Sequence, residues 1–123
     1  MNNTVAYCRS AKSDLEVIIR QLETLNTYGQ KMGYTYSAVY CDCNESGITL
    51  NRPNMQMLIN DIRDGKVKRV IVENISRLFR SSVHTFKLID IFSEYGVELI
   101  SVKDGGFIDI GWAKKSFNML LAL

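Results

Sequence analysis

The sequence lacks several features that mark specialised classes of protein. It has one proline and one histidine among 123 residues, and no apolar run reaches the roughly 18 residues that a membrane-spanning helix needs. Its first residues do not combine a basic stretch with an apolar stretch, as a secretory signal would. We therefore expect a cytoplasmic protein that does not enter a membrane.

The sequence also lacks a large excess of charge of either sign. The formal net charge is +2, from 15 basic and 13 acidic residues, so only the distribution of charge can argue for a nucleic-acid partner. The content of 46% hydrophobic and 23% charged residues is typical of globular proteins and excludes a disordered chain. The length fits a single domain.

Metal-binding and disulfide patterns are missing as well. The three cysteines are Cys8, Cys41 and Cys43, and an odd number without a secretory signal predicts reduced thiols. A single residue separates Cys41 from Cys43, and His84 is the one histidine, so we expect no metal site. No glycine-rich phosphate loop follows the first expected strand, which argues against a nucleotide cofactor. The sequence predicts no cofactor.

Short β-rich runs alternate with helical runs along the chain. The expected strands are residues 4–9, 35–41, 69–73 and 97–102. Alternation of this kind predicts βαβ units, and therefore an α/β fold with a mainly parallel sheet and helices on both faces. Residues 42–52 are polar and rich in turn formers, so we expect a mobile loop there. A ribbon around Gly105 and Gly106 follows the fourth strand.

The expected helices have recognisable starts and ends. Ser13 and Glu16 form a capping box, with Ser13 as the N-cap, and Gly33 stands where that helix ends. The apolar residues at helical spacing behind this cap are Leu15, Ile18, Leu22 and Leu25. Pro53 begins the second helix.

Further helices follow from the same periodicity. The second helix is expected to end at Gly65 and to face inward with Met55, Leu58, Ile59 and Ile62. A third helix, ended by Gly96, carries Val83, Phe86, Ile89 and Phe92. A last helix begins near Trp112, and its uncapped apolar end predicts that it continues beyond residue 123.

Arginines follow three of the expected strands. Ligands bind at the carboxyl ends of the strands in an open parallel sheet, so these side chains should share one edge. They are Arg9, Arg52, Arg77 and Arg80, with Ser10, Asp42, Ser46 and Ser76 beside them. Clustered guanidiniums are poorly tolerated without an anion, and they bind phosphate with paired hydrogen bonds. We predict a phosphate site formed by the four arginines.

Short motifs at these strand ends occur in a specific order. They are Tyr7-Cys8-Arg9, then Gln21, then Asp42-x-x-x-Ser46-Gly47 with Arg52-Pro53, and finally Ser76-Arg77-Leu78-Phe79-Arg80. Nearly the whole chain thereby resembles the catalytic domain of the serine recombinases, the resolvase/invertase family. The matching family motifs are Y-x-R, a glutamine one helix later, D-x-x-x-S-G…R-P and D-R-L-x-R.

The resemblance implies a function on DNA. A member of this family cleaves and rejoins double-stranded DNA through a phosphoserine intermediate, without metal or ATP, as a homodimer that becomes a tetramer when active. It implies that residues 1–123 form the catalytic domain with the start of a long C-terminal helix, the DNA-binding domain lying outside the chain. The four arginines would stabilise charge on the phosphate, with Gln21 and Asp42 in support. Asp42 either orients an arginine or starts a turn.

Two positions depart from the family pattern. The nucleophilic serine is expected two residues after Arg9, where Ala11 stands, and Ser10 lies one residue early. Adjacent strand residues point to opposite faces, so Ser10 replaces that serine only if the strand ends at Arg9 or contains a bulge. Ser76 stands where the family usually has aspartate. Two hypotheses stay open: a recombinase with Ser10 as nucleophile, or a related fold that binds or assembles without cleaving.

Overall fold

The computed structural model describes residues 3–43, 52–78 and 82–121. Its elements in chain order are β1 (Thr4–Ser10), α1 (Leu15–Met32), β2 (Ala38–Cys43), α2 (Pro53–Arg63), β3 (Arg69–Val72), the 3-10 helix η1 (Ile75–Arg77), α3 (Ser82–Glu94), β4 (Glu98–Ser101), the 3-10 helix η2 (Val102–Asp104), β5 (Gly106–Ile108) and α4 (Ile110–Leu121). Within these ranges, no helix is long and apolar enough to cross a membrane.

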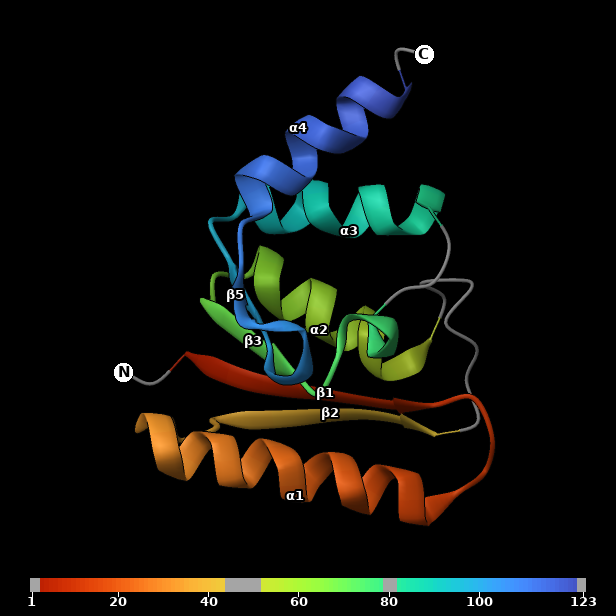
Figure 1. Ribbon diagram of the computed structural model, residues 1–123, viewed down its shortest axis with the longest axis vertical. Helices are drawn as coiled ribbons and strands as arrows, with labels where there is room; N and C mark the ends of the chain where they lie inside the picture. The colour runs from red at the N-terminus through yellow and green to blue at the C-terminus, as the bar shows by residue number, and fades with distance from the viewer. Residues whose placement is uncertain (1–2, 44–51, 79–81, 122–123) are drawn as a thin grey trace.

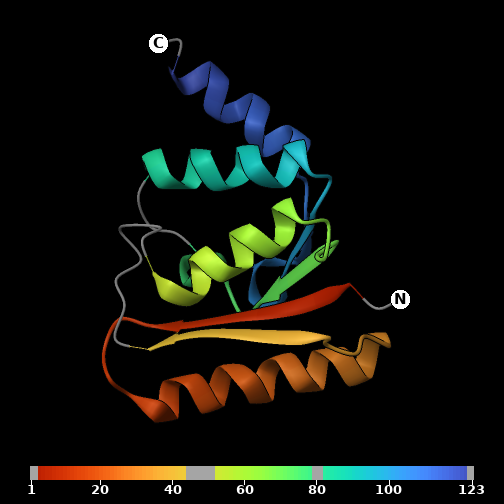
Figure 2. The ribbon, with the colours of Figure 1, turned by 180° about the vertical axis from the view of Figure 1, so that it is seen from behind.

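The strands form one sheet with the order β2-β1-β3-β4-β5. The first four strands are parallel to their neighbours, and β5 pairs with β4 in the antiparallel direction. Helix α1 covers one face of the sheet, while α2 and α3 lie on the other and α4 extends away beside α3 (Figures 1 and 2). The predicted α/β fold, with a mainly parallel sheet and helices on both faces, is confirmed.

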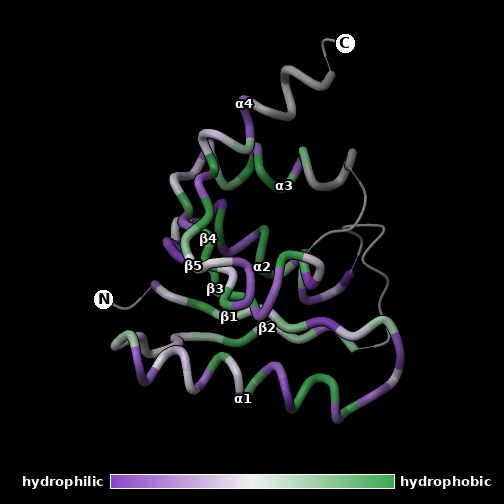
Figure 3. Tube along the Cα trace, viewed as in Figure 1, coloured by the Kyte–Doolittle hydropathy of each residue, from purple (hydrophilic) through white to green (hydrophobic). Residues whose placement is uncertain are grey.

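Two hydrophobic clusters fill the space on either side of the sheet, because successive residues of a strand point to opposite faces. From β1, Val5 and Tyr7 join the cluster that includes residues of α2 and α3. Ala6 and Cys8 join the cluster formed with α1. Figure 3 shows the coloured part of α3 as mainly hydrophobic, whereas hydrophilic and hydrophobic residues alternate along α1. The carboxyl end of β1 is thus held between α1 and α2.

The second helix agrees with its sequence pattern. Pro53 occupies its first turn, and the four residues expected to face inward, Met55, Leu58, Ile59 and Ile62, are all buried. They pack on the sheet in the larger cluster. This packing fixes the start of α2 beside the carboxyl ends of β1 and β2.

The first helix departs from its predicted cap and face. Asp14, and not Ser13, is the N-cap, because its carboxylate accepts a hydrogen bond from the Glu16 amide at 3.1 Å. Ile18 is buried as expected, but Leu22 lies at the surface and Gln21 takes its place in the interior. Spacing alone did not distinguish Leu22 from Gln21, since both lie on the same side of the helix.

The first two strands end later than predicted. Strand β1 continues through Ser10, which is in register with Cys43, so the prediction that β1 ends at Arg9 is wrong. Strand β2 begins at Ala38 and not at residue 35, and the Ser37 amide just before it already bonds to the Thr4 carbonyl of β1 at 2.8 Å. Of the loop predicted over 42–52, residues 44–51 lie outside the described part of the chain.

A side chain completes the hydrogen bonding of β1 where its neighbour stops. Strand β3 pairs with β1 only as far as Ala6, so the backbone of Arg9 has no β3 partner. The buried Gln21 carboxamide accepts from the Arg9 amide at 3.1 Å and donates to the Arg9 carbonyl at 2.9 Å. One glutamine thus makes the two bonds that a neighbouring strand would make, and it ties α1 to the site.

We predict that Gln21→Leu lowers the free energy of unfolding by about 2 kcal/mol, because the buried Arg9 amide loses its acceptor. Leucine has nearly the same volume, so little of the loss would come from packing. Urea denaturation measures the change. Gln30→Leu is the matched control, since Gln30 is exposed on the same helix. An equal effect of both substitutions would contradict this role for Gln21.

Candidate active site

Two buried arginines hold the segment that follows β3. The Arg9 guanidinium donates from Nε to the Arg77 carbonyl at 3.1 Å and from Nη2 to the Ser76 carbonyl at 2.8 Å. Arg52 donates from Nη1 to the same Arg77 carbonyl at 3.2 Å, and from Nη2 to the Leu78 carbonyl. Arg9 is 3% exposed and Arg52 is 0% exposed. In this arrangement both side chains bind backbone and position η1.

A network at the start of α2 fixes Arg52. The Tyr7 hydroxyl accepts from Arg52 Nη1 at 3.0 Å and donates to Asp42 at 2.7 Å. The Asp42 carboxylate also accepts the amides of Asn54 and Met55, each at 2.9 Å, at the N-terminus of α2. Burial raises the pKa of Tyr7, so its hydroxyl stays protonated and can donate. Asp42 therefore orients an arginine through Tyr7 and also caps α2.

The start of η1 is held from the opposite side. The Asp104 carboxylate accepts the Ile75 amide at 2.8 Å and the Ser101 hydroxyl at 2.6 Å. These hydrogen bonds, that of Ser101 first, hold the pKa of Asp104 below its usual value. The described part of the motif-bearing segment, residues 75–78, is thus held by Asp104 at its start and by Arg9 and Arg52 at residues 76–78.

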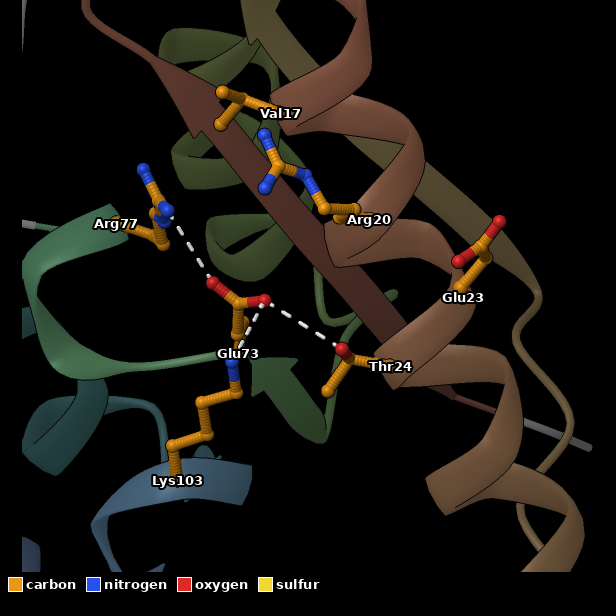
Figure 4. A pocket seen from close by; sticks show the side chains of 7 residues that line it. All are labelled: Val17, Arg20, Glu23, Thr24, Glu73, Arg77 and Lys103. Carbon is orange, nitrogen blue, oxygen red and sulfur yellow. Dashed lines mark hydrogen bonds and ion pairs between the residues drawn. The ribbon is translucent and has the colours of Figure 1, made fainter.

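Arg77 differs from the other two arginines in its surroundings. Its Nη1 donates to the Arg9 carbonyl at 3.2 Å, and its Nη2 lies 3.3 Å from the Glu73 carboxylate. Its Nε is buried and has no hydrogen-bond partner among the described residues. The side chain is 23% exposed and lines a cavity with Val17 and Arg20 of α1 (Figure 4). Of the three site arginines described, Arg77 is the one placed to meet a ligand.

Ser10 is the last residue of β1 and is 3% exposed. Alternation along β1 places its side chain on the α1 face, the face of Cys8 and of the cavity that Arg77 lines, and opposite to Arg9. Its hydroxyl donates to the Lys12 carbonyl at 2.6 Å and accepts the Lys12 amide at 3.3 Å. Ser10 and Arg77 therefore share a face, with the serine hydroxyl engaged by its own turn.

Of the other candidate residues, the structure describes two and leaves two outside the described ranges. Ala11 is exposed in the bend between β1 and α1. Ser76 is exposed on η1, and its hydroxyl donates to the Asn74 side chain. Arg80 and Ser46 lie outside the described residues. The structure thus brings Arg9, Arg52 and Arg77 together around η1, while binding of a phosphate by the four arginines stays a prediction.

Three residues at the site were missed by the sequence reasoning: Glu73, Lys103 and Asp104. Glu73 ends the β3 segment as an acidic residue in a basic stretch, and this was the available signal. Lys103 and Asp104 come from η2, far along the chain, and no local pattern marks them. Within the described ranges, no cluster of three or more histidine, cysteine or acidic side chains could hold a metal ion.

A pair of thiols lies on the face of the sheet that α1 covers. Cys8 and Cys41 are opposite each other on β1 and β2. A hydrogen bond from Cys8 lowers the pKa of Cys41 to about 7, and the same interaction, together with burial, raises the pKa of Cys8. Cys41 is therefore the more acidic thiol of the pair.

We predict that Arg52→Met lowers the free energy of unfolding by about 3 kcal/mol, since buried carbonyls and the Tyr7–Asp42 pair lose a charged donor. Arg77→Met, at a partly exposed position, should cost about 1 kcal/mol. Urea denaturation of both variants measures the difference. If Arg52→Met is no more destabilising than Arg77→Met, then Arg52 does not have the structural role described above.

We predict that alkylation of Cys41 by iodoacetamide reaches half its maximal rate near pH 7. The thiolate is the reactive form, so a lowered pKa moves the rise in rate to lower pH. Cys8→Ala removes the donor and should shift the midpoint toward the ordinary thiol value of about 8.5. Mass spectrometry in a Cys43→Ser background follows the modification. An unchanged midpoint in Cys8→Ala would contradict this cause.

Known proteins are similar to this chain in sequence and in architecture. Residues 4–122 match the family described as Resolvase, N terminal domain. The chain is similar to the Transposon Tn917 resolvase of Enterococcus faecalis, with 27% identity over 117 residues that cover 95% of the chain and 58% of that protein. It thus spans less than two thirds of the length of that relative.

Solved structures agree with the sequence match. The N-terminal catalytic domain of TP901-1 integrase superposes with a TM-score of 0.84 and 30% identity, covering 97% of this chain and 91% of that chain. The C-terminal catalytic domain of ISC1926 TnpA, an IS607-like serine recombinase, has a TM-score of 0.73 and 28% identity, covering 80% of this chain and 66% of that chain. The chain belongs to the family of the resolvase N-terminal domain.

Proposed function

We propose that the chain is the catalytic domain of a serine site-specific DNA recombinase, which cleaves and rejoins DNA without a metal ion. The observation that carries this proposal is the placement of Arg77. Its guanidinium is partly exposed, retains a buried Nε without a described partner, and shares a face with Ser10. Membership of the resolvase family supports the same reaction class.

The reaction is a transesterification at phosphorus. A serine oxygen forms a bond to the scissile phosphorus, the bond from phosphorus to the 3′ oxygen breaks, and that oxygen takes up a proton as a 3′-hydroxyl. The serine hydroxyl proton is released, and the product is a 5′-phosphoserine ester. One phosphate ester replaces another, so the reverse step rejoins DNA without an energy source. Arg77 would stabilise the charge that develops on the phosphate oxygens.

Ser10 is the proposed nucleophile. It stands beside Arg9 at the carboxyl end of β1, and its side chain lies on the face of Arg77. Its hydroxyl now donates to the Lys12 carbonyl at 2.6 Å, so attack requires a rotation that breaks this bond. The change is local, because both partners belong to the turn between β1 and α1. Arg9 and Arg52 would act mainly by keeping η1, and hence Arg77, in place.

The partners follow from the reaction. We propose double-stranded DNA as substrate in the cytoplasm, with a homodimer that assembles into a tetramer when active. Rejoining to a different end requires that cleaved strands from two DNA sites be held together. Integration, resolution and inversion all use this chemistry.

We predict that the full-length gene product that contains this chain forms a covalent protein–DNA adduct on a suicide DNA substrate. The adduct should carry the 5′ end of the DNA. It should vanish in Ser10→Ala and persist in Ser13→Ala and Ser46→Ala, the matched controls from the same region. Denaturing gels and mass spectrometry identify the modified residue.

Other outcomes of this experiment are equally clear. An adduct that persists in Ser10→Ala excludes Ser10 as the nucleophile. If the protein as found forms no adduct and Ala11→Ser creates one, the domain binds or assembles without cleaving and Ala11 marks the lost nucleophile. No adduct in any variant, on substrates that the protein binds, would contradict the proposed reaction.

A further inference from the structure

A buried carboxylate joins four elements at the edge of the candidate site. Glu73 follows β3 directly and is buried. Its Oε1 lies 3.3 Å from Arg77 Nη2, and its Oε2 lies 3.5 Å from both Lys103 Nζ and the Thr24 hydroxyl (Figure 4). Side chains from α1, η1 and η2 therefore meet at this one group.

The surrounding cavity measures about 460 Å³ and lies between α1 and the ends of β3 and η2. The residues that line it are Val17, Arg20, Glu23, Thr24, Glu73, Arg77 and Lys103. Three of these side chains are cationic and two are anionic, so the lining has a small positive excess. Such a lining suits an anionic group better than a neutral one.

Glu73 and the Arg9 carbonyl together fix the plane of the Arg77 guanidinium. One terminal nitrogen is held by each, at 3.3 and 3.2 Å. A guanidinium has five N–H groups in a fixed fork, so holding both terminal nitrogens leaves further donors with a defined direction. Without Glu73, a single hydrogen bond to Arg9 would let the guanidinium rotate.

A carboxylate beside an anion site also repels the anion, and Lys103 counters this. Its Nζ contacts the second oxygen of Glu73, and its backbone amide donates to the Glu73 carbonyl at 2.8 Å. Arg77, Lys103 and Glu73 together carry one net positive charge. The cluster thus orients an arginine and still attracts a phosphate.

We propose that Glu73 is the positioning residue of Arg77 and that Lys103 is a binding residue that keeps this cluster attractive to a phosphate. The proposal rests on the proposed function for its substrate, a DNA phosphate. Ser76 stands where the family usually has aspartate. The side chain of Ser76 is exposed and bonds to Asn74, so the carboxylate on Arg77 comes from three residues upstream.

The test separates rate from affinity. Glu73→Ala should lower the rate of adduct formation at saturating DNA by about 10- to 100-fold, since a misplaced group costs that much. Affinity for the DNA, and for inorganic sulfate, should stay equal or rise, because a negative charge has been removed. Lys103→Met should show the opposite pattern, with weaker binding of sulfate and DNA and little change in the saturated rate.

Glu98→Gln is the matched control. Glu98 also pairs with an arginine, Arg69, at 2.9 Å, but at the start of β3 and β4, the other end of the sheet. It should leave rate and affinity unchanged. If Glu73→Ala does not fold, Glu73→Gln carries the test, because glutamine keeps one acceptor for Arg77 and should give a smaller loss of rate.

A readout without DNA keeps this proposal distinct from the proposed function. NMR relaxation measures the mobility of the Arg77 Nε–H group, whose signal is assigned by its loss in Arg77→Lys. This group should be rigid in the unsubstituted protein and mobile in Glu73→Ala. If the protein forms no adduct but Arg77 loosens as expected, the proposed reaction fails and the positioning role stands. A rigid Arg77 in folded Glu73→Ala would overturn the role of Glu73. An unchanged adduct rate in Glu73→Ala, or in Glu73→Gln where the alanine variant does not fold, would overturn it as well. Unchanged sulfate binding in Lys103→Met would overturn that of Lys103.

Discussion

The organisation of the site depends on hydrogen bonds from side chains to backbone in the place where β3 ends before β1. Beyond Ala6, β3 no longer pairs with β1, and no other strand among the described residues takes its place. Gln21 and Arg77 bond to the backbone of Arg9, and the Arg9 side chain bonds to the backbone of η1. Side chains of α1 and η1 therefore hold β1, and a side chain of β1 holds η1. The candidate site lies where β3 no longer pairs with β1.

Burial divides the arginines by role. Taking a guanidinium out of water is unfavourable unless its donors are satisfied, and Arg9 and Arg52 meet this condition with carbonyl groups of residues 76–78. Arg77 remains partly exposed and is balanced by Glu73. Of these three arginines, Arg9 and Arg52 thus stabilise the fold, and Arg77 lines the cavity.

The sequence pattern predicted what depends on periodicity and could not predict what depends on partners. Apolar spacing identified the inward residues of α2, such as Leu58, because a helix that packs on a sheet needs one apolar side. It failed at Gln21, whose side chain is buried where it hydrogen-bonds to the backbone of Arg9. The strand-end rule gathered the arginines at one edge, but it could not show that Arg9 and Arg52 bind carbonyls, or that Glu73 would meet Lys103 from η2.

The side-chain bonds to Arg9 mean that the two ends of β1 are held by different kinds of partner on the side of β3. At the amino ends, backbone bonds join β1 to β3, and separating them means separating strands. At the carboxyl end, the Arg9 amide bonds to the Gln21 side chain of α1, while β2 stays paired on the other side of β1. Hydrogen exchange at that amide therefore reports on the contact between α1 and β1, whereas exchange inside the ladder requires separation of strands. The amino end of β1 is thus held on this side by a strand, and its carboxyl end by side chains of α1 and η1.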